Sequence, residues 1–97
     1  MIEKYCCTPN DRLKLMRITC KCSQHQFSKI FGVSRATYNR IEKSGNHIDI
    51  NYLYKLNKFG LNPGFILGNT DLLIGKNNNI DSTRKQIISH IKNLENS

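Results

Sequence analysis

The stretch Ser23–Gly45 reads SQHQFSKIFGVSRATYNRIEKSG and predicts two short helices joined by a tight turn. Ser23 is a good N-cap, because its hydroxyl can accept a hydrogen bond from an unpaired amide of the first turn. Gly32 is expected to end the first helix, since glycine adopts left-handed backbone angles at little steric cost. Ser34 can cap the second helix in the same way. Three apolar residues recur at helical spacing and give the first helix one inward face: Phe27, Ile30 and Phe31.

The second helix, which starts after Ser34, has an inward face and an outward face. Tyr38 and Ile41 are expected to point inward. The outward face carries polar and basic residues: Arg35, Ala36, Thr37, Asn39, Arg40 and Lys43. This arrangement is typical of a helix-turn-helix, in which the second helix enters the major groove of DNA.

The stretch resembles the helix-turn-helix of lambda-type phage repressors and Cro proteins, the XRE-like family. The resemblance extends without a gap from about Asp11 to Asn69. It depends on residues at fixed offsets: Gln24, Phe27, Ser28, Phe31, Gly32, Val33, Ser34, Tyr38, Ile41 and Glu42.

The whole chain is predicted to be all-α. Residues 1–70 are expected to form a five-helix, lambda-repressor-like domain, and residues 71–97 a linker and a C-terminal amphipathic helix. The first helix should start at Asn10 or Asp11, either of which can cap it, and end near Cys20.

The fourth helix is expected from Asp49 or Asn51 to Phe59, with Gly60 after it. Asn62 can cap a short fifth helix. Three apolar residues of that helix would close the core: Phe65, Ile66 and Leu67.

The C-terminal helix is predicted to start at Asp81 or Ser82, after a polar linker. One face of it is an apolar stripe: Ile87, Ile88, Ile91 and Leu94. An exposed stripe of this kind needs cover, so it and the end of the core around Phe65 are the two candidate dimerisation surfaces. The alternative is that the helix folds back on its own core. We favour the intermolecular role, because the linker gives the helix reach.

The chain of 97 residues carries a formal net charge of +8, from 15 basic and 7 acidic residues. Residues 1–70 hold 11 of the basic and 4 of the acidic residues, so the charge accompanies the helix-turn-helix. A basic domain suits a polyanion, because phosphate contacts release counterions. The alternative is a solvated basic surface that aids solubility. The motif favours DNA.

Other classes of function are disfavoured. The sequence has no phosphate-binding glycine loop and no nucleophile elbow, so we predict neither an enzyme nor a cofactor. The N-terminus lacks the apolar core of a signal peptide, and no apolar run reaches the length of a membrane span. We therefore expect a cytoplasmic protein with no membrane partner.

Base reading is predicted for the outward residues of the second helix: Arg35, Ala36, Thr37, Asn39 and Arg40. The resemblance implies that the positions of Arg35, Ala36 and Arg40 carry specificity. An arginine can pair bidentately with guanine, so Arg35 and Arg40 are the best candidates. The alternative for either arginine is a phosphate contact.

Phosphate contacts are predicted for six residues: Ser23, Gln24, Ser34, Lys43, Asn46 and His47. The resemblance implies that Gln24 holds a phosphate and braces the recognition helix, at a helix N-terminus that favours an anion. It also implies a structural pair between Glu42 and Arg17, since an arginine can form two parallel hydrogen bonds to a carboxylate.

Four cysteines raise the alternative of a zinc site. Its ligands would come from Cys6, Cys7, Cys20, Cys22 and His25. The spacing matches no established zinc pattern, and Cys20 falls on an apolar helix face. We therefore predict no metal and expect reduced, partly buried thiols.

The sequence as a whole predicts a sequence-specific regulator that binds double-stranded DNA. The resemblance favours a homodimeric repressor of phage or mobile-element type that occupies an inverted repeat. Two alternatives stay open. One is an antitoxin that binds a toxin as its protein partner and regulates its own operon, and the other is a restriction-modification controller.

Overall fold

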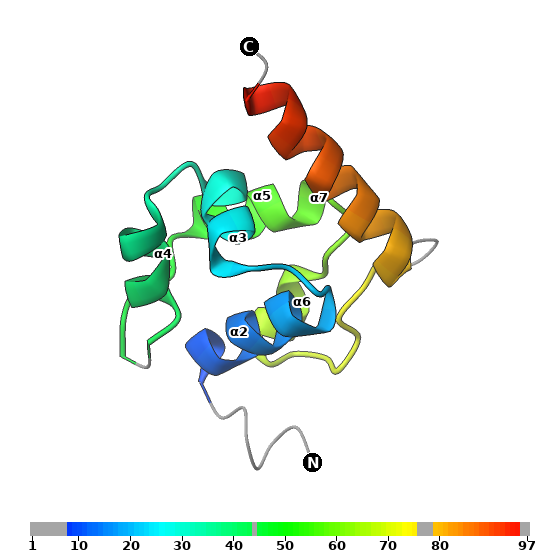
Figure 1. Ribbon diagram of the computed structural model, residues 1–97. Coiled ribbons are helices and arrows are strands. Elements are labelled where there is room, and N and C mark those ends of the chain that lie inside the picture. Colours follow the sequence, from blue (N-terminus) through cyan, green and yellow to red (C-terminus); the bar gives the residue numbers. More distant parts are fainter. Residues whose placement is uncertain (1–7, 44, 76–78, 96–97) are drawn as a thin grey trace.

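The computed structural model describes residues 8–43, 45–75 and 79–95. These ranges hold six helices and no strand: α2 (Pro9–Thr19), α3 (Gln24–Phe31), α4 (Arg35–Ile41), α5 (Ile50–Lys58), α6 (Pro63–Leu67) and α7 (Ile80–Glu95). The prediction of an all-α domain of five helices with a C-terminal helix is confirmed. Figure 1 shows α3 in the centre, with α4 on one side of it and α7 on the other.

Local capping sets the ends of α3 and α4. The Ser23 hydroxyl accepts a hydrogen bond from the Gln26 amide, and the Gln26 side chain accepts one from the Ser23 amide. This reciprocal capping box satisfies two otherwise unpaired amides. Gly32 ends α3 at φ 73°, in the left-handed region that glycine tolerates. Ser34 caps α4 by accepting from the Thr37 amide, so these predicted caps are confirmed.

Two predicted caps are wrong. Thr8, rather than Asn10 or Asp11, caps α2, because Pro9 occupies the first helical position and the Thr8 side chain accepts from the Asp11 amide. Asn79, rather than Asp81 or Ser82, caps α7, and its side-chain oxygen accepts from the Ser82 amide at 2.7 Å. In both helices the residue directly before the first helical residue supplies the side-chain acceptor.

The core forms where the inward faces of the helices meet. Phe31 is stacked on Tyr52, with ring centroids 4.5 Å apart, and meets Tyr38 edge-on at 5.2 Å. Three residues of α2 and the turn after it are also fully buried in this core: Leu13, Met16 and Cys20.

Helix α6 and the segment after it close one end of the core. Asn62 caps α6, as predicted, and Asp49 caps α5 directly before its first residue, Ile50. Phe65 and Ile66 are buried, as predicted, but Leu67 is 57% exposed. A helix of five residues can turn only one side to the core, and Leu67 lies on the other. Residues 71–75, which precede the predicted C-terminal helix, run back beside residues 60–62 through a single antiparallel bridge.

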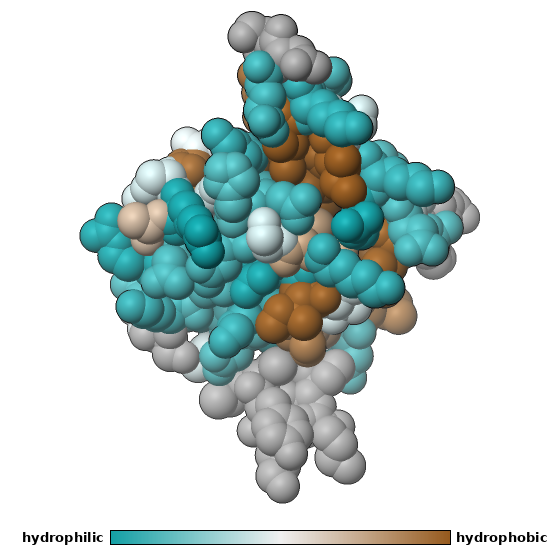
Figure 2. Space-filling view, in the orientation of Figure 1, coloured by the Kyte–Doolittle hydropathy of each residue, from teal (hydrophilic) through white to brown (hydrophobic). Residues whose placement is uncertain are grey.

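Helix α7 packs on the core of its own chain. Ile87 is fully buried and Ile91 is 7% exposed, both within the same apolar cluster as Phe27 and Ile30 of α3. Figure 2 shows hydrophobic side chains along the edge of α7 that faces α3. The expectation that this stripe serves a second protomer is therefore corrected for Ile87 and Ile91, because α3 presents a matching apolar face.

Candidate nucleic-acid interface

Aromatic packing fixes the recognition helix α4 against α3. Tyr38 is fully buried and meets the rings of Phe27 and Phe31 at 6.0 and 5.2 Å between centroids. The tight turn between the helices is closed by the Val33 amide, which donates to the Ser28 carbonyl at 3.0 Å. One side of α4 thus packs in the core, and the other side faces solvent.

The solvent side of α4 forms a shallow hollow together with the start of α3. Five residues line it: Gln24, Arg35, Ala36, Asn39 and Arg40. Arg35, Ala36 and Arg40 are exposed, whereas Asn39 and Thr37 are half-buried. The structure therefore brings the predicted base-reading residues to one surface, beside Gln24.

Thr37 has a local structural role on this surface. Its hydroxyl accepts a hydrogen bond from the Ser34 hydroxyl at 3.0 Å and one from the Arg40 guanidinium at 3.4 Å. The contacts hold the Arg40 side chain over the first turn of α4. A side chain positioned in advance loses less conformational entropy when it binds.

A chain of hydrogen bonds connects α2 to the exposed side of α4. Arg17 donates from Nε to Glu42 Oε2 at 2.6 Å and from Nη2 to Oε1 at 3.2 Å. Gln24 Nε2 donates to Glu42 Oε1, and Asn39 Nδ2 donates to Gln24 Oε1, each at 3.1 Å. Arg17 Nη1 also donates to the Cys22 carbonyl at 2.9 Å.

This network perturbs the groups at its centre. Burial alone would raise the pKa of Glu42, but the hydrogen bonds from Arg17 and Gln24, together with the positive charge of Arg17, outweigh it and lower the pKa. Burial raises the pKa of Tyr38, and the neighbouring Glu42 carboxylate raises it further. The Tyr38 hydroxyl makes no hydrogen bond of standard geometry within the described residues, although it lies near this pair. The carboxylate therefore stays charged and serves as a fixed anchor.

The network assigns positions to Gln24 and Asn39. The Gln24 amide uses its nitrogen toward Glu42 and its oxygen toward Asn39, which is the geometry of a brace between α3 and α4. Asn39, predicted to read bases, has one amide hydrogen directed at Gln24 and keeps its carbonyl oxygen and second hydrogen.

The predicted phosphate contacts fall into two groups. Ser23 and Ser34 are exposed at the starts of α3 and α4, where their hydroxyls already serve as caps. Lys43, Asn46 and His47 are exposed in the loop after α4. The Asn46 side chain donates to the Lys43 carbonyl at 3.1 Å, which shapes that loop. Ser34 and the loop thus lie at the two ends of α4, whereas Ser23 lies at the start of α3, next to Gln24.

Two functional positions were missed in the sequence. Asn10 is 3% exposed, and its Nδ2 donates to the Ile41 carbonyl at 2.7 Å and to the Asn46 carbonyl at 3.0 Å, so it ties α2 to the end of α4. Arg12 is also buried, and its Nη1 donates to the Phe65 carbonyl at 3.0 Å. The only indication in the sequence was that Asn10 lies at a predicted helix start, and this position suggested a cap and not a contact with a distant part of the chain.

The described cysteines belong to the core. Cys20 is fully buried and Cys22 is 5% exposed, and burial raises the pKa of both thiols, that of Cys20 to about 12. Residues 8–43, 45–75 and 79–95 contain no group of three or more His, Cys, Asp or Glu side chains placed to hold a metal ion. Cys6 and Cys7 lie outside the described residues.

An exposed polar helix, braced from behind and set against a second helix by a glycine turn, defines a helix-turn-helix DNA-binding domain. Residues 13–59 match the family model described as "Helix-turn-helix", so the predicted resemblance to lambda repressor- and Cro-like domains is confirmed over these residues. The family consists of DNA-binding transcription regulators. No curated protein and no solved structure matches the chain. Within the part of the chain that the structure describes, no helix is long and apolar enough to cross a membrane.

Proposed function

We propose that the protein is a homodimeric transcriptional repressor of phage or mobile-element type, which occupies an inverted repeat and excludes polymerase. The observation that carries this proposal is the exposed side of α4, where Arg35, Ala36 and Arg40 face solvent while Tyr38 is locked in the core. A rigid helix that presents two arginines matches the geometry of direct readout in the major groove.

The residues around α4 have distinct roles in this proposal. Arg35 and Arg40 read base edges, and Ala36 contacts a base at the same surface. Gln24 and Asn39 hold their place through their mutual hydrogen bond, and either can add a contact from its remaining amide atoms. The backbone of the operator is held at the start of α4 by Ser34 and at the start of α3 by Ser23. The loop after α4 adds contacts from Lys43, Asn46 and His47.

The dimer contact of the proposed repressor lies at the α6 end of the core. Leu67 is 57% exposed there and borders a hollow whose apolar walls include Ile48, Leu53 and Ile66. Phe65 is buried, so it supports this surface from beneath. The tail is less suited, because Ile87 is already covered by its own chain. For the same reason, the antitoxin alternative gains no support, since it needs a tail that is free to bind a toxin.

The DNA-binding part of the proposal is tested by selecting bound duplexes from a random pool with the full chain. We expect an inverted repeat whose half-sites lie one helical turn, about 34 Å, apart. Enrichment of unrelated duplexes, with no common site, would contradict sequence-specific regulation. Enrichment of a single half-site without symmetry would support sequence-specific DNA binding but contradict the proposed dimer.

The dimer is tested with Leu67→Asp, because a carboxylate cannot be buried at an apolar contact without a large desolvation cost. Sedimentation should show a shift from dimer to monomer, while half-site binding is retained. The matched control is Leu94→Asp, another exposed leucine, on α7, which should leave the dimer intact. If only Leu94→Asp produced a monomer, the dimer interface would lie on α7 and not at the α6 end of the core.

A further inference from the structure

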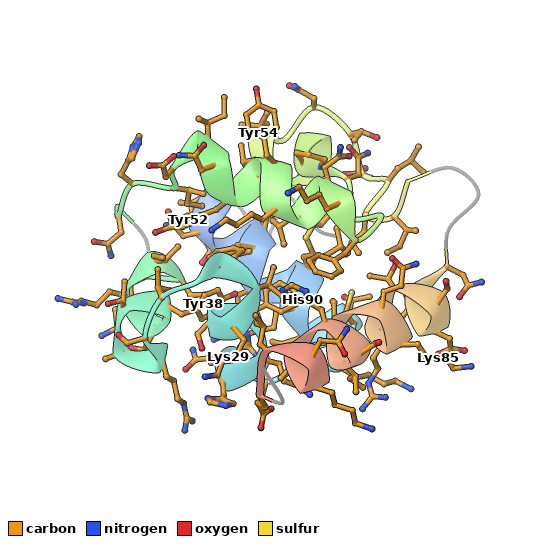
Figure 3. All side chains as sticks on the ribbon, turned by 90° about the horizontal axis from the view of Figure 1, so that it is seen from above. Lys29, Tyr38, Tyr52, Tyr54, Lys85 and His90 are labelled. Carbon is orange, nitrogen blue, oxygen red and sulfur yellow. The ribbon has the colours of Figure 1, made fainter. Side chains whose placement is uncertain are left out.

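A groove that contains none of the predicted DNA-contacting residues lies where the C-terminal parts of α3, α5 and α7 meet. Its lining includes Lys29, Ile30, Lys55, Lys58, Phe59 and His90. A second hollow shares Lys58, Phe59 and His90 with the first and continues along α7 to Lys85. Figure 3 shows His90 between α5 and α7, and Lys85 pointing outward from α7.

The floor of this groove, hereafter the α5–α7 groove, is apolar and held in place. Ile30 is buried beneath it, and the rings of Phe59 and His90 meet edge-on with centroids 5.3 Å apart. Lys55 Nζ donates to the Phe31 carbonyl at 2.9 Å, which fastens the wall formed by α5 to the end of α3. The groove therefore exists before any ligand binds.

The rim of the α5–α7 groove carries charge of one sign. Lys29 comes from α3, Lys58 from α5 and Lys85 from α7, and none of them forms an ion pair within the described residues. No aspartate or glutamate lines either hollow. On α7, Asp81 lies one turn before Lys85, and Glu95 follows Leu94 at the end of the helix. Such a rim repels other cations and favours an anionic ligand.

We propose that the α5–α7 groove binds an acidic segment of a second protein, whose carboxylates face the lysines and whose apolar side chain covers Phe59 and Ile30. An apolar floor inside a charged rim is the usual composition of a protein-binding site, in which the centre is apolar and the rim is polar. Scattered lysines that only aid solubility would not need such a floor.

Two other ligands fit the groove less well. DNA is less suited, because α7 lies on the side of α3 opposite α4 (Figure 1) and because phosphates gain nothing from an apolar floor. A second copy of this chain offers no matching acidic surface among its described residues. Its exposed acidic residues are dispersed, and two of them are engaged: Asp49 caps α5, and Asp71 lies 3.7 Å from Arg12.

The first experiment maps binding on the full chain. The nitrogen-15-labelled protein is titrated, without DNA, with a synthetic peptide of glutamates that contains two leucines. We expect saturable amide shifts around Phe59, His90 and Lys58, with α4 unaffected. Shifts that centre on α4, or no saturable shifts at all, would overturn the proposal. Because no DNA is present, failure here is distinct from failure of the proposed repressor function.

The second experiment uses matched charge reversals. Lys58→Glu with Lys85→Glu should weaken peptide binding by about tenfold, because the rim then repels the carboxylates. Lys14→Glu with Lys92→Glu makes the same change of net charge at exposed positions that line neither hollow, and it should have little effect. If both variants lost the same amount of peptide affinity, the effect would be due to net charge alone, and the proposal would be overturned.

Two further comparisons separate the ligands. A peptide with serine in place of leucine should bind more weakly, since the floor then loses its apolar partner; unchanged affinity would overturn the proposal. Binding of a random-sequence duplex should fall equally in the two charge-reversal variants. A greater loss in the Lys58→Glu and Lys85→Glu variant would instead make the groove a DNA surface.

Discussion

Arg17 and Glu42 join the first helix of the domain to the end of the recognition helix through two hydrogen bonds of 2.6 and 3.2 Å. Their side chains are only 12% and 4% exposed, so the pair is shielded from solvent. Glu42 also accepts from Gln24, which in turn accepts from Asn39. The ion pair is therefore the inner end of a network whose outer end reaches the exposed side of α4.

Glu42→Ala should destabilise the protein strongly. The substitution leaves Arg17 buried without its carboxylate, and breaking a buried pair from one side costs about 3–5 kcal/mol. Urea denaturation should report a loss toward the lower end of that range, since Arg17 keeps its bond to the Cys22 carbonyl. The control is Glu95→Ala at an exposed position, expected to stay within about 0.5 kcal/mol of wild type. Equal stability of the two variants would contradict the structural pair.

The same pair predicts a pH dependence of stability. The pKa of Glu42 is lowered in the folded protein, whereas an unfolded glutamate titrates near its ordinary pKa of about 4.3. The unfolded state therefore binds the proton first, and the contribution of Glu42 is complete above that value and lost as pH falls through the folded pKa. The difference in unfolding free energy between wild type and Glu42→Gln should shrink below about pH 4. A difference that stays constant into strong acid would show that Glu42 stabilises by packing alone.

Arg35→Ala and Arg40→Ala should reduce sequence discrimination. Each arginine is exposed on α4, and a bidentate contact to guanine is worth about 1–3 kcal/mol. Binding to the selected site should weaken by that amount, while binding to random duplexes changes little. Lys14→Ala, at an exposed position on α2, serves as the control for lost charge. An arginine whose removal weakens all duplexes equally is a phosphate contact.

Asn10→Ala should affect both stability and DNA binding. It leaves the carbonyls of Ile41 and Asn46 without their donor, which costs about 1–3 kcal/mol for buried groups. The loop that holds Asn46 should also lose its fixed position, so affinity for the operator should fall. Asn57→Ala, at an exposed position on α5, is the matched control in thermal denaturation and in binding. A variant as stable as this control would rule out the tie between α2 and α4.

The parts of the fold that could be predicted from the sequence are local. Caps such as Ser23 and Ser34 and the turn at Gly32 depend on residues within one helical turn, so the helix-turn-helix and its exposed side could be identified. The roles of Asn10 and Arg12 could not, because their acceptors lie 31 and 53 residues away in the chain.

The surface on which α7 packs could not be predicted from the sequence for a different reason. An apolar stripe on a helix predicts burial but does not specify the partner, and Ile87 would look the same facing its own core or a second protomer. Helix α7 packs on its own chain because α4 and α5 leave one apolar face of α3, which includes Ile30, uncovered. This uncovered face results from the packing of the first five helices, so it could not be predicted from the pattern of α7 alone.

The interior of α7 holds one polar group that works against stability. Thr83 is fully buried, and its hydroxyl has no hydrogen-bond partner within the described residues. In a helix, a threonine hydroxyl can donate to the carbonyl four residues earlier, which also accepts the backbone amide. Here the Asn79 carbonyl accepts the Thr83 amide at 3.0 Å but not the hydroxyl. A buried hydroxyl without a partner loses its hydration and gains nothing in return.

Thr83→Val should therefore stabilise the protein, since valine has the same shape and replaces the hydroxyl with a methyl group. The expected gain is about 1 kcal/mol in urea denaturation, which corresponds to the desolvation cost of an unsatisfied buried group. Thr83→Ala is the matched control, because it removes the hydroxyl and also a methyl that fills the core, so it should fall below Thr83→Val by about 1 kcal/mol. If Thr83→Val instead lowers stability while leaving the packing of α7 unchanged, the hydroxyl makes a hydrogen bond in solution, and the contact between α7 and α3 is more polar than its buried isoleucines imply.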